Sequence, residues 1–540
     1  TACGNECVDL DSSTKHCGTC DMACQGGFPC TDGECRCPDG ETLCDGVCVN
    51  TESEPAHCGA CGSACPEGES CIIGQCGGAV GDACTNTLAH AISITQIAVY
   101  QAGKIPVMDQ GTALDPAERD ADIVAGKDAI VRVFTTTETG FSNRALSARL
   151  SLIDGDTVER VFHKRTVEGP TVENSLATSF NIEVPGDLIT PSTRYMVEIV
   201  ECGADTGTQA SPRFPVTGDE ALAARETGVL KLEFIPVVVN GNTANTDPDR
   251  LELYRQFMEA MYPVSAVEVT VGDPLQANSA VSATGNGWNE TVQQLMSRHQ
   301  SDNAPNDLYY YGLMEPAATL QQYCQGGCVA GIGYVPEDAG PFNTHARVSI
   351  GISYGDGASA STMAHEIGHN HGREHSPCGG AAYAGPFPHE GARIGWWGLY
   401  YPDTLIDPQQ ATDIMGYCDN QWVSDFTYQA FLERVVDINA ALSWINPNPV
   451  GTWEVIVTSV FGSSWGVAPS GAVAASGTAE AASVIDNAGN EIAQVTVYRS
   501  VMGHLNGASI MVPSAEPGWH AIVVDGVPPM VYGSTLVSAP

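Results

Sequence analysis

Basic residues are scarce in this chain. Of its 540 residues, 23 are lysine or arginine and 64 are aspartate or glutamate, so the formal net charge is −41. Because binding to phosphate groups needs a basic face, this balance argues against nucleic acid or an anionic membrane as a partner. A solvated acidic surface, which keeps an exported protein soluble, is the simplest explanation.

Long apolar runs are also missing. No stretch of about 18 apolar residues occurs, so we predict no insertion into a membrane. The sequence given begins with Thr1 and reaches its first cysteine at Cys3, and the charged and apolar regions of a signal peptide do not precede this cysteine. We therefore expect either a mature form or a sequence from which a signal has been trimmed. The length predicts about three or four domains.

Cysteine is rare after residue 84, because sixteen of the 21 cysteines lie between Cys3 and Cys84. This density predicts a disulfide-rich region, 1–84, in a protein that is secreted or lies at the cell surface. Most of these cysteines recur after 41 residues. The first set is Cys3, Cys7, Cys17, Cys20, Cys24, Cys30 and Cys35, and the second is Cys44, Cys48, Cys58, Cys61, Cys65, Cys71 and Cys76.

Two copies of one small disulfide module explain this repeat. Zinc binding is the competing interpretation, because Cys17 and Cys20, like Cys58 and Cys61, have the C-x-x-C spacing of metal ligands. Cys37 and Cys84 fall outside the period and can give each module an eighth cysteine. The pattern resembles cysteine-rich repeats near the start of some exported bacterial proteins, and this resemblance implies a role in spacing, anchoring or adhesion.

Two further regions have the alternating apolar pattern of strands. Residues 129–134 and 146–152 place apolar side chains on one face at period two, and turn residues separate such segments. We predict an immunoglobulin-like β-sandwich over 88–218, in which Cys202 has no assigned partner. A second, C-terminal β-sandwich is predicted over 450–540.

Between these regions, strand and helix patterns alternate. A buried strand at 230–239 is followed by Asp247 and Pro248, a capping pair that opens a helix ending near Tyr262. A second helix is predicted at 288–299 and a closing helix from Ser424. The short segment from Cys324 to Cys328 can close a tight disulfide loop.

One stretch within this region predicts a metal site. His365, Glu366, His369, Gly372 and His375 form the pattern H-E-x-x-H-x-x-G-x-x-H. On a helix, residues four apart share a face, so His365 and His369 can bind one ion while Glu366 stands beside it. Gly372 can take a backbone conformation that ends the helix and brings His375 in as third ligand. Three histidines leave a position for water, which is the catalytic pattern for zinc.

A second motif follows downstream. The segment Asp413-Ile414-Met415-Gly416-Tyr417 has the form of a methionine turn. With both motifs, residues 228–446 resemble the catalytic domain of the metzincin zinc peptidases. The fold class that this resemblance implies is multidomain: an α+β (α/β/α) metzincin-like domain flanked by β-sandwich domains, after an N-terminal disulfide-rich repeat region.

The resemblance also implies roles for single residues. One catalytic Zn²⁺ is expected on His365, His369 and His375, with Glu366 as general base. Met415 is expected to pack beneath the histidines, and Tyr417 to bind zinc or to stabilise the oxyanion. Because the resemblance brings their segments under one metal, Cys378 and Cys418 are expected to form a disulfide.

Residues around the histidine motif allow more than one local role. Ser361 or Thr362 can cap the helix of the motif, and His371 is expected to be either a neighbour of the ligands or exposed. Glu374 is expected to be a surface charge. The aromatic group within 394–401 either walls a substrate subsite or forms a core.

The sequence thus predicts a secreted zinc-dependent endopeptidase acting on a protein or glycoprotein. The order of domains also looks loosely like that of secreted bacterial proteases of the mucin-degrading type. Two alternatives remain: an adhesion or binding protein that keeps a relic metal site, and a zinc hydrolase of a non-peptide bond. Calcium sites are left open.

Overall fold

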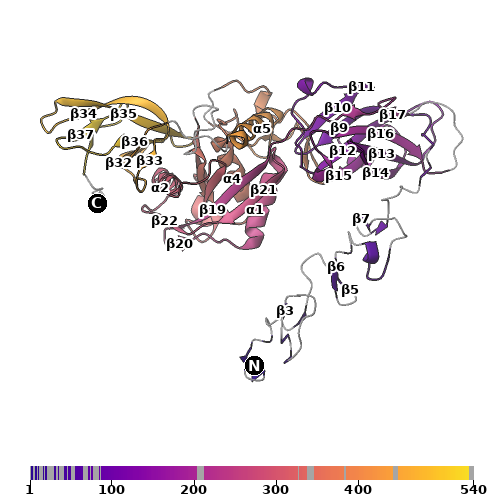
Figure 1. Cartoon of the computed structure of the whole chain (residues 1–540), viewed down its shortest axis with the longest axis horizontal. Coiled ribbons are helices and arrows are strands. Elements are labelled where there is room, and N and C mark those ends of the chain that lie inside the picture. Colours follow the sequence, from indigo (N-terminus) through magenta and orange to yellow (C-terminus); the bar gives the residue numbers. More distant parts are fainter. Residues whose placement is uncertain are drawn as a thin grey trace.

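The computed structural model describes short stretches within residues 2–85, and then residues 87–533 apart from 204–211, 326, 337–345, 382–384 and 442–447. The chain is multidomain and mostly β-sheet, with few helices and a disulfide-rich N-terminal region. Its three larger parts lie in a row, with the helix-containing part in the middle (Figure 1). Among the described residues, no helix is long and apolar enough to cross a membrane.

The N-terminal region repeats structurally as well as in sequence. Disulfides join Cys3 to Cys20 and Cys44 to Cys61, two pairs related by the period of 41. Short hairpins recur in the same way: β1 (Ala2–Cys3) with β2 (Glu6–Cys7), β3 (Cys30–Thr31) with β4 (Glu34–Cys35), β5 (Thr42–Cys44) with β6 (Val47–Val49), and β7 (Cys71–Ile72) with β8 (Gln75–Cys76). The disulfide interpretation of these cysteines is therefore confirmed, and it is consistent with a secreted protein.

One cysteine expectation is wrong. Cys84 does not complete a module but forms a disulfide with Cys202 in the following sheet. The bond closes a loop of 118 residues, which no repeat spacing encodes. It therefore also supplies the missing partner of Cys202 and ties the end of the cysteine-rich region to the next domain.

Two sheets follow and enclose one core. The first has the order β11 (Thr112–Ala113), β10 (Lys104–Asp109), β9 (Ile92–Tyr100), β12 (Ala129–Thr137) and β15 (Phe180–Val184). The second has the order β14 (Thr157–Val167), β13 (Arg144–Asp154), β16 (Arg194–Glu201) and β17 (Arg213–Phe214), and β18 (Glu220–Ala221) also pairs with β16. Apolar residues of both sheets, including Val99, Val131, Leu150 and Val197, are buried in one cluster, as in a β-sandwich.

The middle part contains a mixed sheet of order β21 (Ala266–Val271), β19 (Val229–Val239), β23 (Leu308–Met314), β25 (Val348–Ile352) and β24 (Gly331–Val335). The first four strands are parallel and β24 is antiparallel to β25. Two short strands, β20 (Asn242–Thr243) and β22 (Leu275–Gln276), also pair with β19.

Helices cover both faces of this sheet. Tyr309 and Tyr311 of β23 belong to one core cluster and Tyr310 to another, because successive strand residues point to opposite faces. The first cluster contains residues of α1 (Pro248–Met261), α4 (Gly357–Asn370) and α5 (Asp425–Ala440), and the second contains residues of α2 (Trp288–Ser301) and α3 (Leu320–Cys324). Short pairs complete this part: β26 (Gly398–Tyr400) with β27 (Thr404–Ile406), and β28 (Thr412–Asp413) with β29 (Gln421–Trp422).

The predicted capping residues are right for two helices and wrong for a third, and α2 starts at Trp288 as predicted. Asp247 and Ser424 cap α1 and α5 through their side chains. The helix of the histidine motif, α4, is not capped by Ser361 or Thr362 but begins at Gly357, where the Asp356 side chain accepts from the Ser359 amide. Asp356 satisfies one of the free amides of the first turn, and Ser361 and Thr362 therefore lie inside the helix.

The C-terminal strands differ from the expected sandwich. Most of them form one continuous order: β38 (Met530–Val531), β37 (Ala521–Val523), β34 (Thr478–Ile485), β35 (Glu491–Met502), β36 (Ala508–Pro513), β31 (Trp453–Ser459) and β32 (Gly462–Trp465). The two end strands of this order, β32 and β38, lie next to each other. The indole Nε1–H of Trp465 in β32 donates to the Val531 carbonyl in β38 at 2.9 Å. A short pair, β30 (Val450–Gly451) with β33 (Val473–Ala474), is separate.

The C-terminal sheet is joined to the middle part by polar contacts. Gln293 of α2 is fully buried; its amide donates to the Val467 carbonyl at 2.7 Å and accepts from the Val467 amide at 2.8 Å. Asn289 of the same helix donates to the Thr458 carbonyl at 3.1 Å. In addition, β35 pairs with β24, so both parts share one hydrogen-bonded sheet.

Replacing Gln293 tests this connection. Gln293→Ala removes the acceptor of the Val467 amide and one of two donors to the Val467 carbonyl, the other being the Ser297 hydroxyl. We expect a loss of about 1–3 kcal/mol in unfolding free energy because an unsatisfied buried polar group is costly. Urea unfolding followed by tryptophan fluorescence measures it. Gln294→Ala is the matched control, because the hydrogen bonds of Gln294 lie at the surface. An equal effect of both variants would contradict this role of Gln293.

Candidate metal centre

Helix α4 presents His365, Glu366 and His369 on its buried side. The ring nitrogen Nδ1 of His365 donates to the Ile414 carbonyl at 2.8 Å, and that of His369 donates to the Arg373 carbonyl at 2.7 Å. Since a carbonyl oxygen only accepts, each Nδ1 carries the proton and each Nε2 is left with a free lone pair. Both imidazoles are thus held in the tautomer that binds a metal through Nε2.

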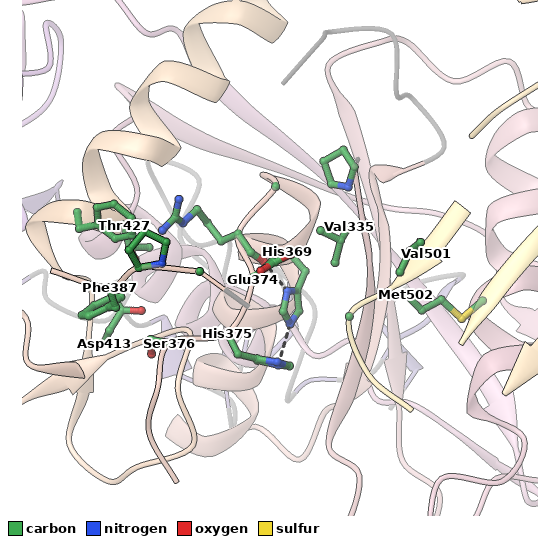
Figure 2. Close-up of a pocket in the computed structure, with 17 residues that line it drawn as sticks. Val335, His369, Glu374, His375, Ser376, Phe387, Asp413, Thr427, Val501 and Met502 are labelled. Atoms are coloured by element: carbon green, nitrogen blue, oxygen red, sulfur yellow. Dashed lines mark hydrogen bonds between the residues drawn. The ribbon is translucent and has the colours of Figure 1, made fainter. Parts of the chain in front are cut away.

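His375 returns to the same place after the helix ends. Gly372 has a φ of 82°, a left-handed conformation that favours glycine, and it turns the chain directly after α4. The Nε2 atoms of His369 and His375 are then 3.2 Å apart, as the dashed line in Figure 2 marks. Two nitrogens on one tetrahedral zinc ion are about 3.3 Å apart at usual bond lengths.

A fourth histidine, which the sequence reasoning missed, completes the cluster. His504 follows β35 in the C-terminal sheet, and His365, His369, His375 and His504 each offer a ligand atom within 4.8 Å of the others. The Nδ1 of His504 is 2.7 Å from the Tyr417 hydroxyl, and its Nε2 is 3.1 Å from Glu366 Oε1. A single histidine in a strand-rich segment far from the motif carries no spacing signal.

The donor set fits a metal ion. The Nε2 atom of His365 and the Oε2 atom of Glu366 are buried and have no hydrogen-bond partner among the described residues, and the Nε2 atom of His504 contacts only Glu366 Oε1. Burial lowers the pKa of His365 and of His504 to about 4, and that of His369 well below its usual value. Neutral imidazoles are the form that coordinates metals, so this His cluster could bind a metal ion.

Glu366 lies beside the histidines in a dry environment. Burial raises the pKa of its carboxyl group to about 8, although the neighbouring His365 acts in the opposite direction. A Cβ atom on Gly331 of β24 would overlap the Glu366 carboxylate, so the absence of a side chain there makes room for it. A carboxyl group with such a pKa can take up and release a proton near neutral pH.

The methionine turn lies under the helix as expected. Met415 is buried, and a Cβ atom added to Gly368 of α4 would lie 2.5 Å from its sulfur. Asp413 holds the turn, since its carboxylate accepts from the amides of Met415 at 3.0 Å and Ser424 at 3.1 Å. Met415 therefore packs directly against α4.

Tyr417 points from this turn to the histidine cluster. Its hydroxyl is 2.8 Å from the Nε2 atom of His375, and the residue is 46% exposed. Burial of the hydroxyl end raises its pKa, so the phenol keeps its proton and can donate a hydrogen bond. The expected disulfide between Cys378 and Cys418 is confirmed, and the Tyr417 amide donates to the Cys378 carbonyl at 3.1 Å.

Two neighbouring residues have simpler roles. His371 is buried and not exposed; its ring stacks on Tyr309 with centroids 5.0 Å apart, and its Nδ1 donates to the Ile367 carbonyl at 2.8 Å. It therefore fixes α4 and does not belong to the ligand cluster. Glu374 is exposed, as expected of a surface charge.

A cavity of about 750 Å³ adjoins the histidines. His369 and His375 form one side of it, Phe387 and Asp413 lie further along, and Val501 and Met502 lie across from them near Val335 (Figure 2). The space can take a side chain of a molecule bound at the metal centre.

The aromatic group at 394–401 does not line this cavity. Trp396 is buried and donates through its indole to the Val423 carbonyl at 3.0 Å. Leu399, with Trp397 and Tyr401, packs against Tyr100 and Phe134 of the N-terminal sandwich. The group is therefore a core between two domains, which resolves the two alternatives in favour of packing.

Comparison with known proteins reaches only the N-terminal region. Residues 33–79 match the stigma-specific STIG1-like protein family. No curated protein matches the chain. The matched residues cover most of the second cysteine module and stop before the metal centre, so the function of that centre has to be argued from its geometry.

Removing the disulfide beside the metal centre tests its role. The double variant Cys378→Ser and Cys418→Ser loses a crosslink that spans 40 residues. We expect its free energy of unfolding to fall by about 2–4 kcal/mol, because the unfolded chain gains conformational entropy. Thermal unfolding with and without added Zn²⁺ measures it. The matched control is Cys324→Ser with Cys328→Ser, whose loop spans only 4 residues. Equal losses would contradict a special role for Cys378 and Cys418.

Proposed function

We propose that this chain is a secreted zinc-dependent endopeptidase of the metzincin type. The observation that carries the proposal is the convergence of His365, His369 and His375 with Glu366 and Tyr417. The mixed sheet with helices on both faces, and Met415 packed against α4, support an α/β/α metzincin-like domain. The disulfides support export.

His365, His369 and His375 would hold the zinc ion through their Nε2 atoms. When bound, zinc acts as a Lewis acid that polarises the scissile carbonyl and lowers the pKa of water. The backbone carbonyls of Ile414 and Arg373 orient two of the imidazoles.

Glu366 performs the proton transfers. Its carboxylate takes a proton from the attacking water and later delivers it to the nitrogen of the leaving amine. The hydroxyl of Tyr417 is placed to donate a hydrogen bond to the oxyanion that develops on the carbonyl.

The two alternative functions make different demands on these residues. An adhesion protein with a relic metal site has no use for a buried carboxylate such as Glu366, whose desolvation is costly. A zinc hydrolase of a non-peptide bond shares the chemistry, and it differs in the substrate it cleaves. Protein or glycoprotein remains the proposed substrate.

Glu366→Ala separates catalysis from metal binding. We expect this variant to bind Zn²⁺ and to lose at least about 10²-fold of casein cleavage, because the general base is gone. Metal content is measured by mass spectrometry and cleavage by long incubation at high protein concentration. Glu390→Gln, an exposed carboxylate that does not line the cavity, is the matched control and keeps wild-type rates. Wild-type cleavage by Glu366→Ala would reject the assignment.

Metal removal gives an independent test. We expect casein cleavage to stop after treatment with a chelator and to return when Zn²⁺ is added in slight excess, because the histidines supply the ligands. Cleavage that persists in the metal-free protein would exclude the proposed chemistry. Cleavage of a non-peptide ester with no action on peptide libraries would instead favour the second alternative.

A further inference from the structure

The C-terminal sheet enters the metal centre through backbone contacts. Strand β35 pairs antiparallel with β24, so that Val501 lies opposite Val335 and Met502 opposite Tyr334. The Gly503 amide then donates to the Gly333 carbonyl at 2.8 Å. Figure 2 shows Val501 and Met502 across from Val335, beside His369.

Strand β24 is otherwise the edge of the central sheet. Its other side pairs with β25, so without β35 the free amides and carbonyls of β24 would face outward. Such an edge accepts an extended peptide of almost any sequence by strand addition. A Cβ atom on Gly331 of this strand would overlap the Glu366 carboxylate, so a peptide on this edge passes close to the general base.

A tight turn carries His504 into the site. Leu505 and Asn506 have φ values of 58° and 44°, which are typical of the two central residues of a hairpin turn matched to strand twist. Leu505 packs against the cluster on the α2 face of the sheet, and a Cβ atom on Gly507 would overlap Asn289. The turn is therefore held on α2, with His504 at the metal centre.

His504 occupies the space that catalysis needs. It lies between the Tyr417 hydroxyl at 2.7 Å and Glu366 Oε1 at 3.1 Å, the two groups assigned to the oxyanion and the water. Three histidines leave an open position on zinc, whereas four nitrogen or sulfur ligands form the closed set of structural sites.

We propose that residues 501–504 are a built-in blocking segment. His504 serves as fourth metal ligand, and residues 501–503 take the β24 edge that an extended substrate would use. Cleavage requires this segment to leave. The blocking role rests on the proposed peptidase function, while the ligand role of His504 does not.

Spectroscopy of the cobalt-loaded protein tests the ligand role without any activity. An open position on Co²⁺ takes azide and changes the visible absorption, so we expect a clear azide response in His504→Ala and almost none in the wild type. His520→Ala, directly before β37 of the same sheet and outside the histidine cluster, is the matched control and should match the wild type. We also expect Co²⁺ affinity to fall at least about tenfold in His504→Ala. An equal azide response in wild type and His504→Ala would overturn the ligand role.

Casein cleavage tests the blocking role. If about 90% of the wild-type molecules are closed, His504→Ala should cleave about tenfold faster. Gly503→Ala should also cleave casein faster, although it retains His504. The added Cβ atom would lie 2.8 Å from the His369 ring and would keep residues 501–504 from packing against the site. Its Co²⁺ affinity shows whether His369 still binds. Slower cleavage by His504→Ala would overturn the blocking role and make His504 a catalytic aid.

The two failures can be told apart. If no variant cleaves casein but azide binds cobalt only in His504→Ala, the peptidase proposal fails and the fourth ligand stands. If His504→Ala cleaves and Glu366→Ala with His504→Ala does not, the peptidase chemistry holds. The rate of His504→Ala relative to the wild type then decides for or against blocking.

Discussion

The constraint on which this structure depends is the burial of ligand atoms that have no protein partner. The Nε2 atom of His365 and the Oε2 atom of Glu366 lie out of solvent without hydrogen bonds among the described residues, and the Nε2 atom of His504 has only its contact with Glu366 Oε1. Leaving such atoms unpaired costs about 1–3 kcal/mol each, so a fold keeps them only where something else compensates. A cation is the partner that suits several neutral imidazoles and a carboxylate at once. The surrounding elements can be understood as the support that holds this costly group together.

Close backbone approach provides much of that support. Gly331 on β24 leaves room for the Glu366 carboxylate, Gly368 within α4 lets Met415 lie directly beneath the helix, and Gly503 lets the C-terminal turn reach the His369 ring. Each glycine comes from a different element, so the site requires β24, α4 and β35 to meet within a few ångströms. The disulfide between Cys378 and Cys418 fixes the segment after His375 to the methionine turn. A side chain added at any of these glycines would therefore shift the histidines or Glu366.

The sequence predicted the parts of the site that chemistry ties to fixed spacing. His365, Glu366, His369 and His375 are encoded by helix periodicity and a glycine turn, and the caps Asp247 and Ser424 by local hydrogen bonding. Two long-range contacts were missed: the disulfide between Cys84 and Cys202, and the approach of His504 to the histidine motif. Both arise only through tertiary packing between domains. The start of α4 was placed too late, since several residues there can cap a helix and only the folded chain selects Asp356.

For the proposed peptidase, the connection between the two sheets would also decide how a substrate competes with the segment at 501–504. Because β35 belongs to the same chain as β24, the segment at 501–504 is present at an effective concentration on the order of millimolar, whatever the protein concentration. Weak pairing is then enough to keep the edge occupied against a free peptide. The Gln293 contacts with Val467 lie outside this pairing, so the segment can leave β24 while the C-terminal sheet remains attached through α2. Opening therefore needs the loss of a few backbone hydrogen bonds, of the His504 contact and of the packing of Leu505 on the α2 face. The domain core around Ile456 and Val497 can stay intact.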